Sequence, residues 1–192
     1  MDEIKYNYRK SILRHYVNYT LTKDGLLITS PDYKDRIIPY HEITSLRFEY
    51  LLNNRYDSNR YSCTIYTIDN KEYQILSTSY AGIANFENQA EPYVVFVKGL
   101  LAIVRKINPN SKIYLGQSKI KYFGNMVLLI LVLLLLLSVM SYFPVSASFS
   151  IVFKLIMIVF FSFYMVLSFT KNYPRELEIG QEIDESVLPK IK

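Results

Sequence analysis

The chain has 192 residues, of which 51% are hydrophobic, and its 22 Lys and Arg residues outnumber its 17 Asp and Glu residues, for a net charge of +5. A single cysteine, Cys63, excludes an intramolecular disulfide and is typical of a reducing compartment. The charge is mildly positive, but no basic stripe alternates with exposed aromatic residues, so nucleic-acid binding is not expected.

Apolar and polar residues alternate in several short runs before residue 80, and this period of two predicts half-buried β-strands. In Ile43–Tyr50, for example, Leu46 and Phe48 share one face. Asp24-Gly25 favours a tight hairpin turn between two runs, and Asp69-Asn70 joins another pair. The predicted strands are His15–Leu21, Leu26–Thr29, Arg36–Pro39, Ile43–Tyr50, Arg60–Ile68 and Glu72–Ser79, with a polar loop over Leu51–Asn59.

The spacing of apolar residues changes to three and four after Ala81, which predicts one amphipathic helix. Pro92 fits the first turn of this helix, and Asn108-Pro109 ends it. The apolar stripe consists of Tyr93, Phe96, Val97, Leu100, Leu101, Val104 and Ile107.

Six or seven short antiparallel strands followed by one helix is the layout of a pleckstrin-homology-like (PH-like) barrel. We therefore expect an α+β soluble domain over residues 1–112, a PH-like β-barrel closed by its C-terminal helix. Tyrosines are frequent in this part of the chain and suit a small β core, because each adds a large buried ring with a polar tip. The alternative is a generic α+β sandwich with the helix on one face.

Two long apolar runs predict an α-helical two-span transmembrane hairpin. The first run, 126–143, has 18 residues without a charge. At about 1.5 Å per residue it is roughly as long as a bilayer core is thick. The second run, 149–169, is interrupted only by Lys154. The predicted segments are a linker over 113–125, the hairpin over 126–169 with its connection at 144–148, and a tail over 170–192.

Basic residues flank the hairpin on one side, and such flanks are typically cytoplasmic. The abundance of Lys, Ile, Asn and Tyr suggests an AT-rich bacterial genome. We therefore expect a multi-pass protein of the bacterial cytoplasmic (inner) membrane with both termini in the cytoplasm. The basic domain is attracted to an anionic leaflet. The residues expected to contact that leaflet are Lys112, Lys119, Lys121, Lys171 and Arg175.

Short motifs spread over most of the chain form a recognisable set. They are Tyr19-Thr20-Leu21-Thr22, Asp24-Gly25-Leu26, Ile38-Pro39-Tyr40, Glu42-Ile43, Ser45-Leu46-Arg47, Tyr61-Ser62-Cys63, Tyr80-Ala81-Gly82, Phe86-Glu87, Tyr93, Phe96, Val97, Asn172, Pro174, Arg175, Leu188 and Pro189. In this order they resemble an uncharacterised family of bacterial inner-membrane proteins, in which a PH-like domain precedes two transmembrane helices. Asp184 stands where the family often has proline. The resemblance implies a fold and a location, and no reaction.

Signals for catalysis are weak. His15 and His41 fall in different elements without the closely spaced ligands of a zinc site, and Cys63 is expected to be a small core residue. No glycine-rich phosphate loop is present. We therefore expect no enzymatic activity, no catalytic or metal-binding residue and no cofactor. Specific phosphoinositide binding is not favoured, because the first predicted hairpin loop carries a single basic residue, Lys23, beside Asp24.

Lys154 is the most unusual residue of the predicted hairpin, since a charge inside a span costs about 3 kcal/mol at the centre. It lies near the outer end of the second span, so we expect its side chain to extend to the interface. The alternative is a lysine that pairs with a partner helix or lines a pore. Ser138 and Ser141 are candidates for helix pairing.

The leading hypothesis is a membrane-anchored, non-enzymatic interaction or scaffold module. Its PH-like domain would bind a segment of another membrane or cytoplasmic protein at a sheet edge or an end pocket. The acidic stretch 176–185 is a further candidate ligand, docked on the basic domain in cis or from a neighbour. The alternative is a small channel or transporter subunit, a homo-oligomer built on the hairpin and Lys154. An enzyme is a third hypothesis, with no residue constellation behind it.

Overall fold

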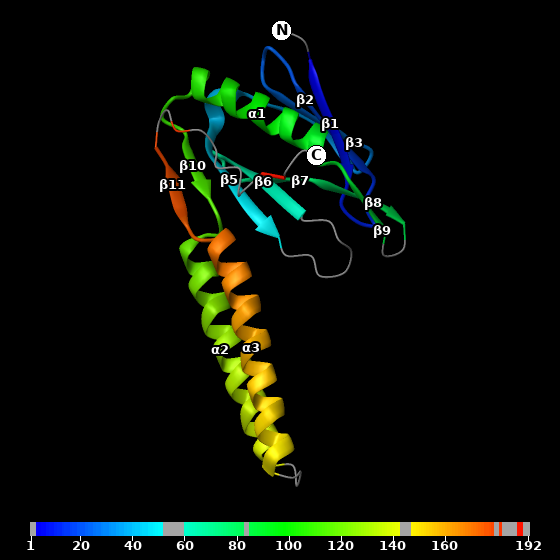
Figure 1. The fold of residues 1–192 in the computed structure, drawn as a ribbon. Helices are drawn as coiled ribbons and strands as arrows, with labels where there is room; N and C mark the ends of the chain where they lie inside the picture. Colours follow the sequence, from blue (N-terminus) through cyan, green and yellow to red (C-terminus); the bar gives the residue numbers. More distant parts are fainter. Residues whose placement is uncertain are drawn as a thin grey trace. The chain divides into compact units, whose positions relative to one another are not determined.

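The computed structural model describes residues 3–51, 60–82, 85–142, 147–178, 181 and 188–189. The chain forms two compact units, one from residues 1–116 and 175–192 and one from residues 117–174. The first unit contains sheets and one helix, and the second is a pair of long helices (Figure 1). The predicted polar loop lies outside the described residues except for Leu51, and residues 144–146 of the predicted interhelical connection lie outside them too.

A four-stranded antiparallel sheet opens the first unit, in the order β1-β2-β3-β4. Its strands alternate between buried and exposed positions, and Tyr6, Tyr8 and Tyr19 are buried on its inner face. The predicted Asp24-Gly25 turn joins β2 to β3, and Thr22 N–H donates to Gly25 O at 3.0 Å. The strands are β1 (Ile4–Arg9), β2 (Tyr16–Leu21), β3 (Leu26–Ser30) and β4 (Tyr33–Ile38).

A five-stranded sheet follows, in the order β11-β10-β5-β6-β7. Its centre is an antiparallel meander, in which Asn70 turns the chain from β6 to β7 with a φ of 58°. Outside β5, β10 runs parallel to β5 and β11 runs antiparallel to β10. The elements are the 3-10 turn η1 (Tyr40–Glu42), β5 (Ile43–Leu51), β6 (Arg60–Thr67), β7 (Glu72–Leu76), the separate hairpin β8 (Thr78–Gly82) and β9 (Asn85–Asn88), β10 (Lys112–Leu115) and β11 (Arg175–Leu177).

β10 and β11 fall within the segments predicted as linker and tail. Residues 113–125, predicted as a linker, contain most of β10 and the start of a helix. The predicted tail 170–192 contains the end of a helix and then β11, which belongs to the sheet, and Leu188 is 5% exposed in the core of the same unit. The soluble unit is therefore completed by residues on both sides of the helical hairpin.

Helix α1 (Ala90–Ile107) confirms the predicted amphipathic helix. Most of its apolar stripe is buried, and Phe96 packs against Tyr6 and Tyr19 with ring centroids 5.7 and 6.3 Å apart. The helix ends at Asn108, whose side-chain amide donates to Ile43 O at 3.0 Å. The N-terminal half of α1 thus packs against the inner face of the first sheet at β1 and β2.

The α+β class is confirmed, but the predicted closed barrel is not found. Within the described residues, β4 and β7 are end strands of two different sheets, and no ladder joins them. Tyrosine hydroxyls from the first sheet take the place of strand pairing at β7. Tyr6 Oη donates to Leu76 O at 2.5 Å, and Tyr8 Oη donates to Gln74 O. In a closed barrel, the backbone of another strand would bind this edge of β7. Here tyrosine side chains bind part of it instead.

Helices α2 (Lys119–Tyr142) and α3 (Ala147–Lys171) form the second unit and pack side by side (Figure 1). Each is long and apolar enough to cross a membrane, over Lys119–Val139 and Ile151–Lys171. Their apolar side chains are largely exposed, as expected of residues that face lipid. α2 begins before the predicted span 126–143, and α3 extends beyond both ends of the predicted span 149–169.

We predict that Gly25→Ala destabilises the soluble unit by about 1–3 kcal/mol. A Cβ at residue 25 would lie 2.4 Å from Ile38 O, a backbone atom that can move only with β4. Gly82→Ala is the matched control, because a Cβ there meets nothing within 4 Å. Thermal unfolding of the detergent-solubilised protein measures the stability of both variants. Equal thermal midpoints for the two variants would contradict the close approach of the β2–β3 turn to Ile38 of β4.

Candidate functional site

A cleft of about 570 Å³ lies in the first unit, between the inner face of the first sheet and the edge of β7. We call it the tyrosine cleft. Its volume lies in the range of ligand-binding pockets. Its lining residues are Tyr8, Lys10, Arg14, Val17, Tyr19, Ile28, Asp32, Tyr33, Lys34, Arg36, Glu72, Tyr73 and Gln74.

The inner wall of the tyrosine cleft is built by tyrosines that bind the β7 backbone. Tyr8 Oη and Tyr19 Oη both donate to Gln74 O, the latter at 3.4 Å. Burial raises the pKa of Tyr8 to about 12 and the pKa of Tyr19 well above its ordinary value, so both hydroxyls stay protonated and act as donors. The inner wall is therefore apolar and fixed in place.

Tyr73 adds an unsatisfied polar group to the same cleft. Its hydroxyl oxygen is buried and has no protein partner. The Arg36 guanidinium lies 5.5 Å from the centre of the Tyr73 ring. A buried hydroxyl without a partner carries a desolvation cost. Tyr73 thus lines the cleft while its hydroxyl is buried behind the wall.

The rim of the tyrosine cleft is predominantly basic. Lys10, Arg14, Lys34 and Arg36 contribute four cations, against the carboxylates of Asp32 and Glu72. Lys10 Nζ donates to Gln74 Oε1 at 3.2 Å. Lys34 is exposed. This charge balance favours ligands that carry carboxylate or phosphate groups.

Arg36 is oriented by Asp69 of the β6–β7 turn. Its Nη2 lies 2.8 Å from Asp69 Oδ2, and Lys71 Nζ lies 2.6 Å from the same oxygen. Thr67 Oγ1 donates to Asp69 Oδ1 at 2.5 Å. The hydrogen bonds from Lys71, Thr67 and Arg36, in that order, hold the pKa of Asp69 well below its usual range. Asp69 therefore remains ionised and keeps Arg36 at the cleft wall.

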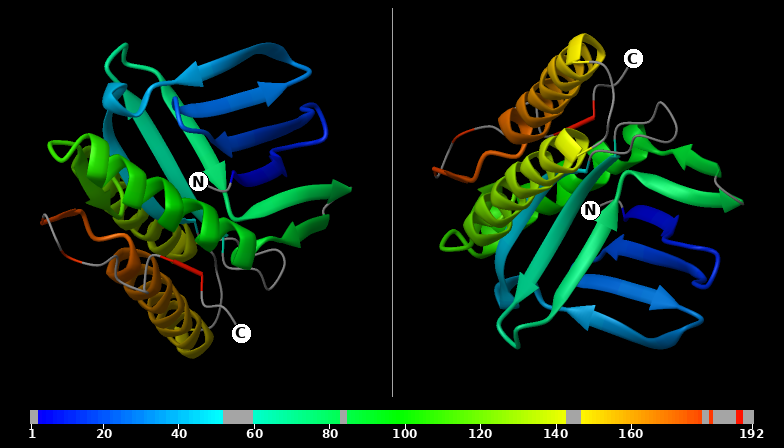
Figure 2. Two further views of the ribbon diagram at one scale, coloured as in Figure 1. Left: turned by 90° about the horizontal axis from the view of Figure 1, so that it is seen from above. Right: turned by 90° about the horizontal axis from the view of Figure 1, so that it is seen from below.

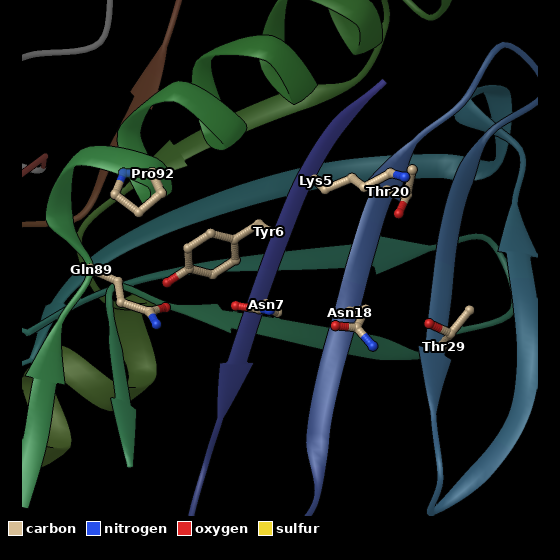
Figure 3. Close-up of a pocket in the computed structure, with 8 residues that line it drawn as sticks. All are labelled: Lys5, Tyr6, Asn7, Asn18, Thr20, Thr29, Gln89 and Pro92. Carbon is tan, nitrogen blue, oxygen red and sulfur yellow. The ribbon is translucent and has the colours of Figure 1, made fainter. Parts of the chain in front are cut away.

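A smaller cleft of about 310 Å³ lies beside the first sheet (Figure 3). Asn7 and Asn18 face each other across β1 and β2, and Thr29 follows across β3. Gln89 and Pro92 close one end, and Gln89 Oε1 is buried without a protein partner. Tyr6 is the one aromatic residue that lines this cleft, whereas four tyrosines line the tyrosine cleft.

The residues considered for catalysis are not brought together. His15 contacts Asp32, with Nδ1 and Oδ1 2.5 Å apart, whereas His41 lies in η1. Cys63 is fully buried in β6, and burial raises the pKa of its thiol, which suits a core residue. Within the described residues, no group of three or more His, Cys, Asp and Glu side chains could hold a metal ion.

The basic residues expected at the leaflet are divided between the two units. Lys119 and Lys121 lie in the first turn of α2, and Lys171 ends α3. Lys112 and Arg175 belong instead to β10 and β11, and Lys112 Nζ lies 3.4 Å from Glu176 Oε1.

Aromatic residues gather at the same end of the helical hairpin. Tyr122 packs on Phe169 and Tyr173 with ring centroids 5.0 and 5.9 Å apart, and Gln117 N–H donates to Asn172 O at 3.1 Å. Tyrosine and lysine residues at one helix end are typical of a membrane interface. Lysine and aromatic residues therefore gather at one end of the hairpin.

The residues singled out inside the spans lie towards the other end of the hairpin. Lys154 is in the second turn of α3 and is partly buried. Ser138 is exposed on α2, and Ser141 is in the last turn of α2, where side chains fall outside the described part. The structure does not bring these three residues into one described cluster.

No protein-family model, no curated protein and no solved structure matches the chain. The candidate site therefore rests on the geometry of this chain alone. Sequence reasoning missed the tyrosine cleft. It also missed strand β1, for which the alternation of Tyr6 and Tyr8 was a usable signal.

We predict that Asp69→Asn lowers the thermal midpoint at neutral pH, because three hydrogen bonds to a carboxylate are weakened. The folded-state pKa of Asp69 lies below its unfolded value. Its contribution is therefore fully present above the ordinary aspartate pKa of about 3.9 and is lost as the pH falls through the folded value. Thermal unfolding is measured from pH 7 downward. The midpoints of the unsubstituted protein and of Asp69→Asn should become equal in acid. Asp35→Asn, at an exposed position of β4, is the control. If the difference in thermal midpoint between Asp69→Asn and the unsubstituted protein stayed the same in acid, the role of the carboxylate would be contradicted.

Proposed function

We propose that the protein is a membrane-anchored, non-enzymatic interaction module that binds an acidic, extended segment of another protein in the tyrosine cleft. The observation that carries this proposal is the cleft itself, with a fixed tyrosine wall, a basic rim and a strand edge along one side. An extended segment lying along Glu72–Gln74 would place acidic side chains beside Lys34 and Arg36. Peptides that lie along a sheet edge commonly bind in this way.

The anchoring part of the proposal is supported by the second unit. α2 and α3 are each long enough to span a bilayer, and lysines and tyrosines lie at one common end. Since β10 precedes α2 and β11 follows α3, and these two strands pair, both ends of the hairpin belong on the same side of the membrane. The excess of lysine at these ends favours the cytoplasmic side of a bacterial inner membrane.

A PH-like origin of the domain is also part of the proposal. A four-stranded meander, then the β5–β7 meander, then α1 is the order of elements in PH-like domains, and it accords with the resemblance found in the sequence motifs. The chain departs from that layout by the hairpin β8–β9 and by β10 and β11 at the edge of β5. The open side between β4 and β7 is where the tyrosine cleft lies.

Contacts within the chain support docking of the acidic tail on the domain to which it is joined. Glu176 lies 3.4 Å from Lys112, and Arg105 Nη2 donates to Gln181 O at 2.6 Å. Residues 179–180 and 182–185 of the acidic stretch are outside the described part of the chain. The described tail contacts involve α1 and β10, so the tail does not line the tyrosine cleft where it is described.

We predict that native mass spectrometry of the protein, gently extracted from its own membrane, shows a monomer or dimer that carries a different protein. Lys34→Glu should remove this companion, because it reverses a charge at the cleft rim. Lys98→Glu, an equivalent reversal at an exposed position of α1, should retain it.

Two outcomes would count against this function. A companion that survives Lys34→Glu as well as Lys98→Glu would place binding away from the tyrosine cleft. A closed homo-oligomer of four or more copies without a companion would favour the channel alternative and make Lys154 the next residue to substitute.

A further inference from the structure

The loop between β1 and β2 exposes apolar side chains at one end of the first sheet. Leu13 is 88% exposed and Ile12 is 57% exposed. Tyr16 begins β2 and Tyr33 begins β4, and each is 47% exposed. The β1–β2 loop and the β3–β4 turn lie at the same end of the sheet (Figure 2). Single exposed apolar residues are ordinary, but four at one tip form a local surface.

The β1–β2 loop is held in a defined shape by its own hydrogen bonds. The Arg9 guanidinium donates from Nε to Arg14 O at 2.6 Å and from Nη2 to Ile12 O at 2.8 Å. Arg14 N–H donates to Ser11 O at 3.2 Å. These bonds use backbone carbonyls as acceptors, and the side chains of Ile12 and Leu13 stay exposed. A loop that is already ordered loses little entropy on binding.

A second contact fixes the loop to the β3–β4 turn. His15 N–H donates to Asp32 Oδ2 at 3.1 Å, and His15 Nδ1 lies 2.5 Å from Asp32 Oδ1. The hydrogen bonds from the His15 ring and backbone lower the pKa of Asp32, which stays ionised. Because of this tie, the loop and the turn present one continuous tip that holds Ile12, Leu13 and Tyr33.

Cations surround this apolar tip. Lys10 and Arg14 flank Ile12 and Leu13 within the loop, and Lys34 lies on the neighbouring strand. The nearby carboxylate of Asp32 is engaged by His15. An apolar tip with basic neighbours fits the chemistry of an anionic bilayer surface, where aliphatic groups enter the acyl boundary and cations meet the headgroups.

We propose that the β1–β2 loop is a second membrane contact, in which Ile12 and Leu13 insert into an anionic leaflet while Lys10, Arg14 and Lys34 bind its headgroups. The inference rests on the proposed membrane anchoring, since the hairpin would keep the loop at high effective concentration near the bilayer. It shares Lys10, Arg14 and Lys34 with the rim of the tyrosine cleft, whereas Ile12 and Leu13 do not line that cleft.

The test uses the full chain in vesicles with an environment-sensitive nitrobenzoxadiazole label at Leu13→Cys. Cys63 is fully buried, so the native thiol remains unlabelled. The matched control is the same label at Ile68→Cys, an apolar residue 70% exposed next to Asp69 in the β6–β7 turn. Vesicles of phosphatidylcholine alone are compared with vesicles that also contain phosphatidylglycerol, and flotation of the protein with the vesicles is recorded for each.

We expect the emission of the label at residue 13 to shift to the blue in the anionic vesicles, with a smaller shift in the neutral vesicles and none at residue 68. Adding Arg14→Gln should reduce the inserted-to-free ratio about fivefold, the effect of one basic residue near an anionic surface. This substitution keeps the backbone oxygen of residue 14, which accepts the hydrogen bond from Arg9 Nε.

The inference alone would be overturned if the protein floats but the label at residue 13 does not shift, or shifts equally at residues 13 and 68. An equal shift in neutral and anionic vesicles would likewise overturn the role of the basic residues. If the protein did not float with either kind of vesicle, the membrane anchoring would fail and the loop insertion with it.

Discussion

The pairing of β10 with β11 is the constraint on which the rest of the structure depends. These strands stand immediately before and after the helical hairpin, and they occupy neighbouring positions in one sheet. The chain must therefore leave and re-enter the same soluble unit, which places both ends of the hairpin together. β10 also pairs with β5, so the edge of β5 is occupied by the chain itself. The hairpin is consequently an insertion in the domain rather than an appendage to it.

The same arrangement decides which surfaces of the domain remain for binding. With β5 covered by β10, strand addition at that edge is blocked. At the other end of the sheet, β7 pairs with β6 alone among the described strands, and tyrosine hydroxyls bind its Gln74 and Leu76 carbonyls. This substitution of side chains for a strand prevents closure of a barrel and leaves the tyrosine cleft beside β7. Asp69 and Arg36 then fix the charged wall of the cleft. The hydrogen bonds of the tyrosine hydroxyls to β7 thus account both for the unclosed barrel and for the tyrosine cleft.

Sequence reasoning found the elements with strong periodicity and missed those defined by long-range pairing. α1, the β5–β6–β7 meander and the two apolar helices follow from local patterns that the structure confirms. β10 and β11 are four and three residues long, and their pairing joins positions about sixty residues apart, which no local pattern encodes. β1 was recoverable from the alternation of Ile4, Tyr6 and Tyr8. The tyrosine cleft was not, because it depends on hydroxyls of β1 and β2 contacting a strand more than fifty residues away.

Disulfide formation between Tyr114→Cys and Glu176→Cys in isolated membranes tests the central claim most directly. These residues are register partners in β10 and β11. The account predicts an intramolecular disulfide, detected by mass spectrometry of the linked peptides, and much less linkage when the second cysteine replaces Glu178, outside the β10–β11 ladder. Absence of the 114–176 link, or a link only between two copies of the chain, would contradict a hairpin inserted within one folded domain.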